Sequence, residues 1–146
     1  MINVEQCFQL ITFRVDGPPV AKGRARATAI GGTARLYTPA KTRAYEDRIR
    51  IAAAMAMGDR KPFQGEVALT VTAFVAIPKS FSRARRTSAI IGVNHPTTRP
   101  DADNYAKAAL DGCNGILFRD DSQVTDLIVR KRYAAEPCLI VTMEAL

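Results

Sequence analysis

Residues 66–77 read EVALTVTAFVAI, and this stretch decides how the rest of the chain is organised. One alternating set of side chains consists of valine, leucine, isoleucine and alanine. The other set consists of alanine, threonine and phenylalanine. Alternation with two largely apolar faces predicts a central strand that is covered on both sides. Pro78 ends the strand, because proline cannot donate to a sheet ladder.

Two elements are predicted near the N-terminus. Residues 7–15 alternate apolar and polar side chains and predict a half-buried strand, with Ile11, Phe13 and Val15 on one face. Residues 20–37 contain basic side chains around several glycines, which predicts a flexible basic loop or an irregular hairpin.

A long helix is predicted over residues 40–57. Thr38 is the expected N-cap, Pro39 the expected first helical residue and Gly58 the expected C-terminal stop. Apolar side chains recur at helical spacing: Tyr45, Ile49, Ala52, Ala53 and Ala56. Of these, Tyr45, Ile49 and Ala53 are expected in the core rather than at a ligand.

Further elements are predicted after the central strand. Residues 80–91 favour a short basic helix, and residues 104–113 a helix ended by an Asn-Gly turn. Residues 124–133 and 138–144 favour two strands joined in an antiparallel hairpin at Glu136-Pro137. The order predicts an α+β fold in a single domain over residues 1–146, a mixed sheet with helices packed on it.

Composition limits the function classes. A chain of 146 residues with 47% hydrophobic residues and no long apolar run is expected to be a cytoplasmic protein with no membrane contact. No signal peptide is recognisable at the start. Three scattered cysteines and a single histidine exclude a disulfide framework, a zinc site and a catalytic histidine pair.

The charge is unevenly distributed along the chain. Residues 99–126 carry six aspartates and three basic residues, so this segment has a net charge of −3. The whole chain carries +7, which leaves +10 for the rest. An acidic centre in a basic body favours a polyanionic partner and a divalent cation, although a basic surface can also serve solubility alone.

The acidic centre begins at RPDADNYAK, residues 99–107. Pro100 biases the preceding residue away from helix, so an extended entry is expected. Residues two apart in an extended segment point the same way, which would aim Asp101 and Asp103 at one point. A simpler alternative is that Asp101 is a solvated loop residue and Asp103 a helix cap.

Two further features accompany this pair. Asp103, Lys107 and Asp111 are spaced by four along one predicted helical face, where Lys107 could meet a phosphate or could simply belong to a solvated charge ladder. Asp120 and Asp121 stand at a turn that could return to the pair. Converging carboxylates without histidine or cysteine favour Mg²⁺, and the calcium-loop pattern of an EF-hand is absent.

The stretch RPDADNYAKAALDGCNGILFRDDSQV, residues 99–124, resembles the signature of the RusA family of Holliday junction resolvases. Two N-terminal stretches, GPPVAKGRARAT at residues 17–28 and YTPAKTRAYE at residues 37–46, resemble the basic loop and first helix of that family. The resemblance covers most of the chain.

The resemblance implies a homodimeric, Mg²⁺-dependent endodeoxyribonuclease, with Mn²⁺ as a substitute. It would resolve four-way DNA junctions by symmetric paired nicks in recombination and repair, in a bacterial cytosol and encoded by a bacterium, prophage or phage. It implies Asp101, Asp103 and Asp121 as metal-binding catalytic carboxylates, Asp120 as an additional metal ligand, and Lys107 as a catalytic residue. No small-molecule cofactor is expected.

Two basic stretches are assigned to phosphate contact. Residues 22–43 contain six basic residues and no acid, and residues 67–100 contain five and no acid. The expected DNA-binding side chains are Lys22, Arg24, Arg26, Arg83, Arg85 and Arg86. Three alternatives remain: a Mg²⁺-dependent nuclease acting on nucleotides or on flap or other branched DNA, a catalytically silent junction-binding protein, and a structural basic protein.

Overall fold

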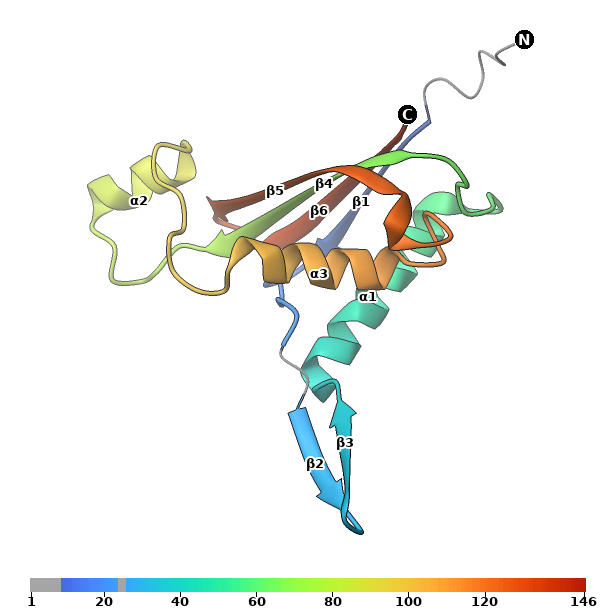
Figure 1. Ribbon diagram of the computed structural model, residues 1–146. Helices are drawn as coiled ribbons and strands as arrows, with labels where there is room; N and C mark the ends of the chain where they lie inside the picture. The colour runs from blue at the N-terminus through green and yellow to red at the C-terminus, as the bar shows by residue number, and fades with distance from the viewer. Residues whose placement is uncertain (1–8, 24–25) are drawn as a thin grey trace.

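The computed structural model describes residues 9–23 and 26–146 (Figure 1). The elements in this part of the chain are β1 (Leu10–Asp16), β2 (Arg26–Ile30), β3 (Thr33–Tyr37), α1 (Ala40–Met57), β4 (Val67–Ala76), α2 (Arg83–Ile90), α3 (Ala102–Cys113), the 3₁₀ turn η2 (Asp121–Gln123), β5 (Val124–Ala134) and β6 (Cys138–Ala145). The predicted residues 7 and 8 of the first strand lie outside the described residues.

The main sheet has the strand order β1-β6-β4-β5. The central strand β4 runs parallel to β5 and antiparallel to β6, so the predicted α+β fold with a mixed sheet is confirmed. The predicted hairpin between the last two strands is wrong, because β4 lies between β5 and β6. The short connection at Glu136-Pro137 spans two strand spacings, about 10 Å, instead of making a tight turn.

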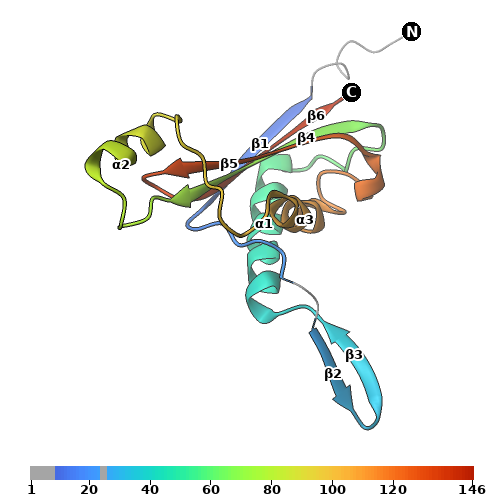
Figure 2. The same cartoon turned by 60° about the vertical axis from the view of Figure 1, so that its left-hand side comes forward.

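Helices α1 and α3 cover one face of the sheet, as both views show (Figures 1 and 2). The covered face of β4 is fully buried at Leu69, Val71 and Ala73, but the alternate residues Thr70 and Thr72 are only half-buried. The prediction that β4 is covered on both faces is therefore wrong. Small and threonine side chains tolerate partial exposure, so the sequence pattern did not require a second layer.

Helix α1 has the predicted bounds, and its predicted core residues Tyr45, Ile49 and Ala53 are buried. The predicted cap is wrong: Pro39 is the N-cap residue, with extended backbone (φ −54°, ψ 143°) and no side-chain cap bond. Helix α3 packs closely on α1 at Gly112, where an added Cβ would lie 2.6 Å from Cγ2 of Ile49.

Strands β2 and β3 form a hairpin that projects from the body beside the start of α1 (Figures 1 and 2). This agrees with the predicted irregular hairpin. Every residue of β3 is exposed, including Leu36 at 77% and Tyr37 at 46%. A hairpin exposed in this way adds little to the core of its own chain.

The remaining predictions concern shorter elements. The predicted helix over residues 80–91 is α2, capped by Ser82, whose Oγ accepts a hydrogen bond from the Arg85 backbone N–H at 3.2 Å. In β1, the predicted inward face of Ile11, Phe13 and Val15 is buried. None of the helices in the described part of the chain combines the length and apolar character that crossing a membrane requires.

Candidate active site

The acidic pair lies at the start of α3. Asp101 is the N-cap residue, with extended backbone (φ −72°, ψ 153°), and Asp103 lies in the first helical turn. The predicted extended alternation of the two is therefore wrong, since the helix begins at Ala102 rather than Asn104. Both residues instead lie at the N-terminal end of α3.

Neither member of the pair is used structurally within the described residues. Asp101 makes no side-chain cap bond, both residues are exposed, and neither forms an ion pair in that part of the chain. Asp101 lines a cleft of about 650 Å³, together with Lys22, Gly23, Arg99 and Asn104. Asp101 in this cleft and the exposed Asp103 beside it both have free carboxylate oxygens to offer a hard cation.

Lys22 joins the base of the hairpin to both helices. Its backbone N–H donates to the Asn104 carbonyl at 2.9 Å, and Gly23 N–H donates to Oγ1 of Thr42 at 3.2 Å. Its Nζ lies 2.5 Å from Oε1 of Glu46 and 3.0 Å from Oδ2 of Asp111. This ammonium is largely buried and paired with two carboxylates, so its position does not support the predicted phosphate contact.

The pKa of Lys22 reflects two opposing effects. Burial lowers it, but the hydrogen bonds with Glu46 and Asp111 outweigh burial and raise the pKa above the usual value of 10.5. Lys22 therefore stays charged across the neutral range. It links α1, α3 and the hairpin base by charge-assisted contacts.

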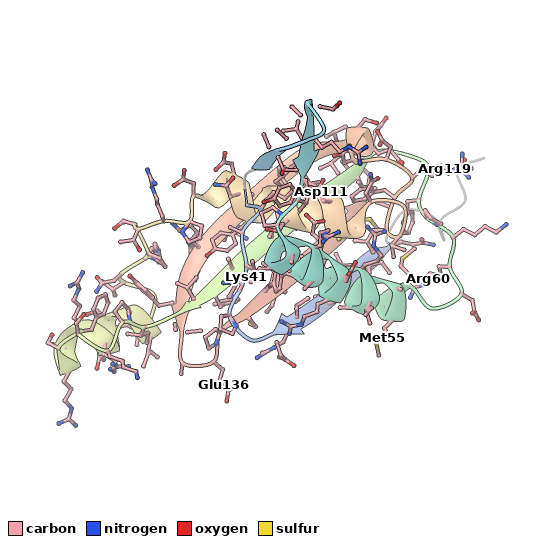
Figure 3. All side chains as sticks on the ribbon, turned by 90° about the horizontal axis from the view of Figure 1, so that it is seen from below. Lys41, Met55, Arg60, Asp111, Arg119 and Glu136 are labelled. Atoms are coloured by element: carbon pink, nitrogen blue, oxygen red, sulfur yellow. The ribbon has the colours of Figure 1, made fainter. Side chains whose placement is uncertain are left out.

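Lys107 lies on the predicted face of α3. Its Nζ is 3.1 Å from Oδ1 of Asp111, one turn further along the helix, and its side chain is 54% exposed. The predicted alignment of Asp103, Lys107 and Asp111 is confirmed by this pairing and by the helix bounds. Figure 3 shows Asp111 beside α1, consistent with its contact to Lys22.

The second acidic group forms a local cap. Oδ2 of Asp120 accepts from the Ser122 backbone N–H at 3.2 Å and from its hydroxyl, while Oε1 of Gln123 accepts from Asp120 N–H at 3.0 Å. The Ser122 bonds hold the pKa of Asp120 below its usual value. Asp121 follows, half-buried, as the first residue of η2.

The structure does not bring the two acidic groups together. Gln123 Nε2 donates to the carbonyls of Phe63 and Gly65, and β5 begins opposite Val67 at the start of β4. The acidic pair lies at the other end of α3 (Figure 1), and a helix of 12 residues is about 18 Å long. In the described part of the chain, no three acidic, histidine or cysteine side chains are close enough to hold a metal ion.

The predicted DNA-binding arginines differ in their contacts. Arg83 is exposed at the start of α2, whereas the Arg85 guanidinium lies over the Phe81 ring, 3.9 Å from its centroid. Arg86 NH2 donates to the Pro78 carbonyl at 3.4 Å. Arg24 lies outside the described residues, and Arg26 is placed only by its backbone in β2. Of these residues, Arg83 has the position most open to a phosphate.

Sequence reasoning missed Glu46 as a partner of Lys22. Glu46 is the first acidic residue after Asp16, at the end of a long basic stretch. It also lies one helical turn from Thr42, the buried polar residue of α1. Both features could have marked Glu46 as a carboxylate placed to neutralise an inward lysine.

Comparison with known proteins agrees with this architecture. The sequence matches the RusA endodeoxyribonuclease family over residues 16–144. It is 36% identical over 129 residues to Uncharacterized protein YqaN of Bacillus subtilis (strain 168), which covers 87% of this chain and 90% of that protein. The chain therefore belongs to the RusA family of endodeoxyribonucleases, as its sequence motifs predicted.

Proposed function

We propose that the chain is a divalent-metal-dependent endodeoxyribonuclease that resolves four-way DNA junctions by paired nicks, in recombination and repair. The observation that carries the proposal is the unengaged pair at the start of α3: Asp101 lines a cleft with Arg99, and Asp103 is exposed in the first helical turn beside it. The chain that presents this pair belongs to an endodeoxyribonuclease family. We take the whole chain as one nuclease domain working in the bacterial cytosol.

Asp101 and Asp103 would hold Mg²⁺, with Mn²⁺ as a substitute. Two carboxylates suit this ion, because Mg²⁺ keeps several waters and takes phosphate oxygens as further ligands. When bound, the ion would activate water and stabilise charge on the phosphate. Arg99 lines the same cleft and would orient the scissile phosphate, while Lys107 is exposed one helical turn from Asp103 and would stabilise the leaving oxygen.

Exposed basic side chains on α2, β3 and α1 would bind the DNA backbone. Arg83 on α2, Arg35 on β3 and Lys41 at the start of α1 are exposed, and Figure 3 labels Lys41 on α1. Contacts of this kind hold the duplex in position without reading its sequence. A projecting hairpin on one side and α2 on the other suit a branched substrate better than a straight duplex (Figure 1).

A two-fold dimer would match the two equivalent strands of a junction. It would also account for Asp121, which is separated from the acidic pair by the length of α3 within one chain. In our proposal, Asp121 acts in the site of the partner subunit. Two copies related by a two-fold axis near the middle of α3 would place each η2 turn near the partner's helix start.

A cleavage assay tests the proposal. A labelled four-way junction and a linear duplex of the same sequence are incubated with the protein, with and without Mg²⁺. Paired nicks in the junction alone, dependent on metal, are expected. Asp103→Asn should bind the junction without cutting it, whereas Asp126→Asn, which alters an exposed carboxylate of β5, should cut normally.

Each contrary outcome identifies an alternative. Cutting of flaps or other branched DNA at the same rate would replace the junction resolvase with a broader nuclease. Tight junction binding without cutting under any metal would leave a silent binding protein. Absence of both binding and cutting would reject the proposal altogether.

A further inference from the structure

A second cavity, of about 290 Å³, adjoins the acidic cleft. It lies where the ends of β4 and β5 meet the start of α3, and prolines from three separate loops line it: Pro18, Pro19, Pro78, Pro96 and Pro100. Tyr105, only 2% exposed, contributes to its inner wall, and Tyr133 of β5 lines it as well. We refer to this cavity as the proline pocket.

The proline pocket and the acidic cleft share part of their walls. Arg99 and Pro100 line both cavities, and Asp101 is the next residue in the chain. A group inside the proline pocket would therefore be next to a phosphate contacted by Arg99. This adjacency connects the pocket to the same DNA strand.

The walls define the chemistry of the occupant. Proline and tyrosine rings offer flat apolar surfaces, while Arg99 and Lys131 add two cations and none of the lining residues is acidic. The Lys131 ammonium donates to the Thr98 carbonyl at 2.7 Å and keeps further protons for an acceptor. An occupant with a flat ring, hydrogen-bond acceptors on its edge and a phosphate attached is a nucleotide base.

The size and rigidity of the pocket agree with this occupant. A volume of about 290 Å³ is at the lower end for small-molecule sites, which suits one base rather than a base pair. Tyr133 makes an edge-to-face contact with Phe81, with 5.5 Å between the ring centroids. The Arg85 guanidinium lies over the ring of Phe81. The tyrosine wall is thus braced by α2 and the loop before it.

We propose that the proline pocket receives one unstacked nucleobase next to the phosphate that is cut. This inference rests on the proposed function, because it takes DNA as the substrate. Bases beside a branch point are less stably stacked than those in a duplex, so extruding one costs less there. The pocket would thereby favour branched DNA and would read the base that enters it.

Fluorescence of 2-aminopurine tests this inference. The base is placed in turn at each position beside the cut phosphate of a junction, and the protein is added in metal-free buffer. The fluorescence of 2-aminopurine should rise on binding at one position, because stacking in the DNA quenches this base and extrusion relieves the quenching. Thr98→Trp, which fills the pocket but keeps the backbone carbonyl bonded to Lys131, should abolish the rise and slow cleavage about tenfold.

Thr97→Trp provides the matched control, because Thr97 is exposed beside the pocket without lining it. It should keep both the rise and the cleavage rate. A junction that is bound and cut without brightening at any position would overturn the pocket and leave the nuclease. If the fluorescence rises with the wild-type protein and not with Thr98→Trp, but neither protein cleaves the junction, the pocket is supported and the nuclease is rejected. No binding to DNA would reject both.

Discussion

Nζ of Lys22 lies 3.0 Å from Oδ2 of Asp111, and this contact ties the base of the β2–β3 hairpin to the helix that begins with the acidic pair. The same ammonium contacts Glu46 of α1. Three segments far apart in the chain therefore meet at one largely buried charge cluster. Its role is to hold the cleft wall at Lys22 and Gly23 against α3.

Removing the ammonium should destabilise the fold. Lys22→Met would leave Glu46 without its cation and Asp111 with Lys107 alone, at a cost of about 1–3 kcal/mol in the free energy of unfolding, measured with urea. Because the folded pKa of Lys22 is raised above 10.5, the difference from wild type should persist below that pH and shrink as the pH rises through the raised pKa. Lys22→Arg provides the charge-retaining control. A difference that grows at alkaline pH would contradict the assignment.

The close crossing of α1 and α3 can be tested at Gly112. A methyl group there would lie 2.6 Å from Cγ2 and 2.7 Å from Cβ of Ile49, so Gly112→Ala should cost about 1–3 kcal/mol of stability by overpacking. Gly65→Ala is the matched control, since nothing lies within 4 Å of its added Cβ. Urea denaturation compares the two. Equal stability of both variants would show that the helices separate freely.

The Asp120 cap at η2 should contribute to the stability of the fold, and this contribution should be lost in acid. Asp120→Ala removes the side-chain acceptor of Ser122, so the melting temperature at neutral pH should fall. Since the pKa of Asp120 is below its usual value of 3.8, the stabilisation is complete above that value and is lost as the pH falls through the lowered pKa. Wild type and variant should therefore converge in strong acid. Asp126→Ala, at an exposed carboxylate of β5, should show no such convergence.

Substitutions of Arg83 and Arg85 in α2 should have different effects, because the two side chains make different contacts. Arg83→Gln should weaken junction binding and lower the salt dependence of the binding constant by about one unit of slope, with stability unchanged. Arg85→Gln should also loosen Phe81, which the guanidinium covers at 3.9 Å. Binding measured across a salt series, with thermal melting of each variant, separates phosphate contact from packing. An unchanged slope in Arg83→Gln would remove that residue from the DNA surface.

Mixed dimers test the proposed role of Asp121. Asp103→Asn and Asp121→Asn should each be inactive alone, but refolded mixtures should recover nicking of one strand. The physical reason is that one of the two composite sites in the mixed dimer would contain all its carboxylates. Recovery in the mixture would also demonstrate the dimer. Full activity of Asp121→Asn alone would instead restrict the metal site to Asp101 and Asp103.

Much of this protein was predictable from local sequence. Alternation identified β1 and β4, helical spacing identified α1, and an Asn-Gly turn marked the end of α3. The family motif and the four-residue spacing from Asp103 to Asp111 placed three charged side chains on one helical face, as the structure has them. These features depend on the local conformation of the backbone, which neighbouring residues largely determine.

Long-range pairing decided the rest. The sequence could not tell that β4 lies between β5 and β6, since a three-residue connection suits a crossing as well as a hairpin. It placed Asp120 and Asp121 beside the acidic pair, but the strand that follows starts at the far end of α3. It assigned Lys22 to DNA, yet the helices supply two carboxylates for it. Which charges meet depends on segments distant in the chain, and only the tertiary packing brings these together.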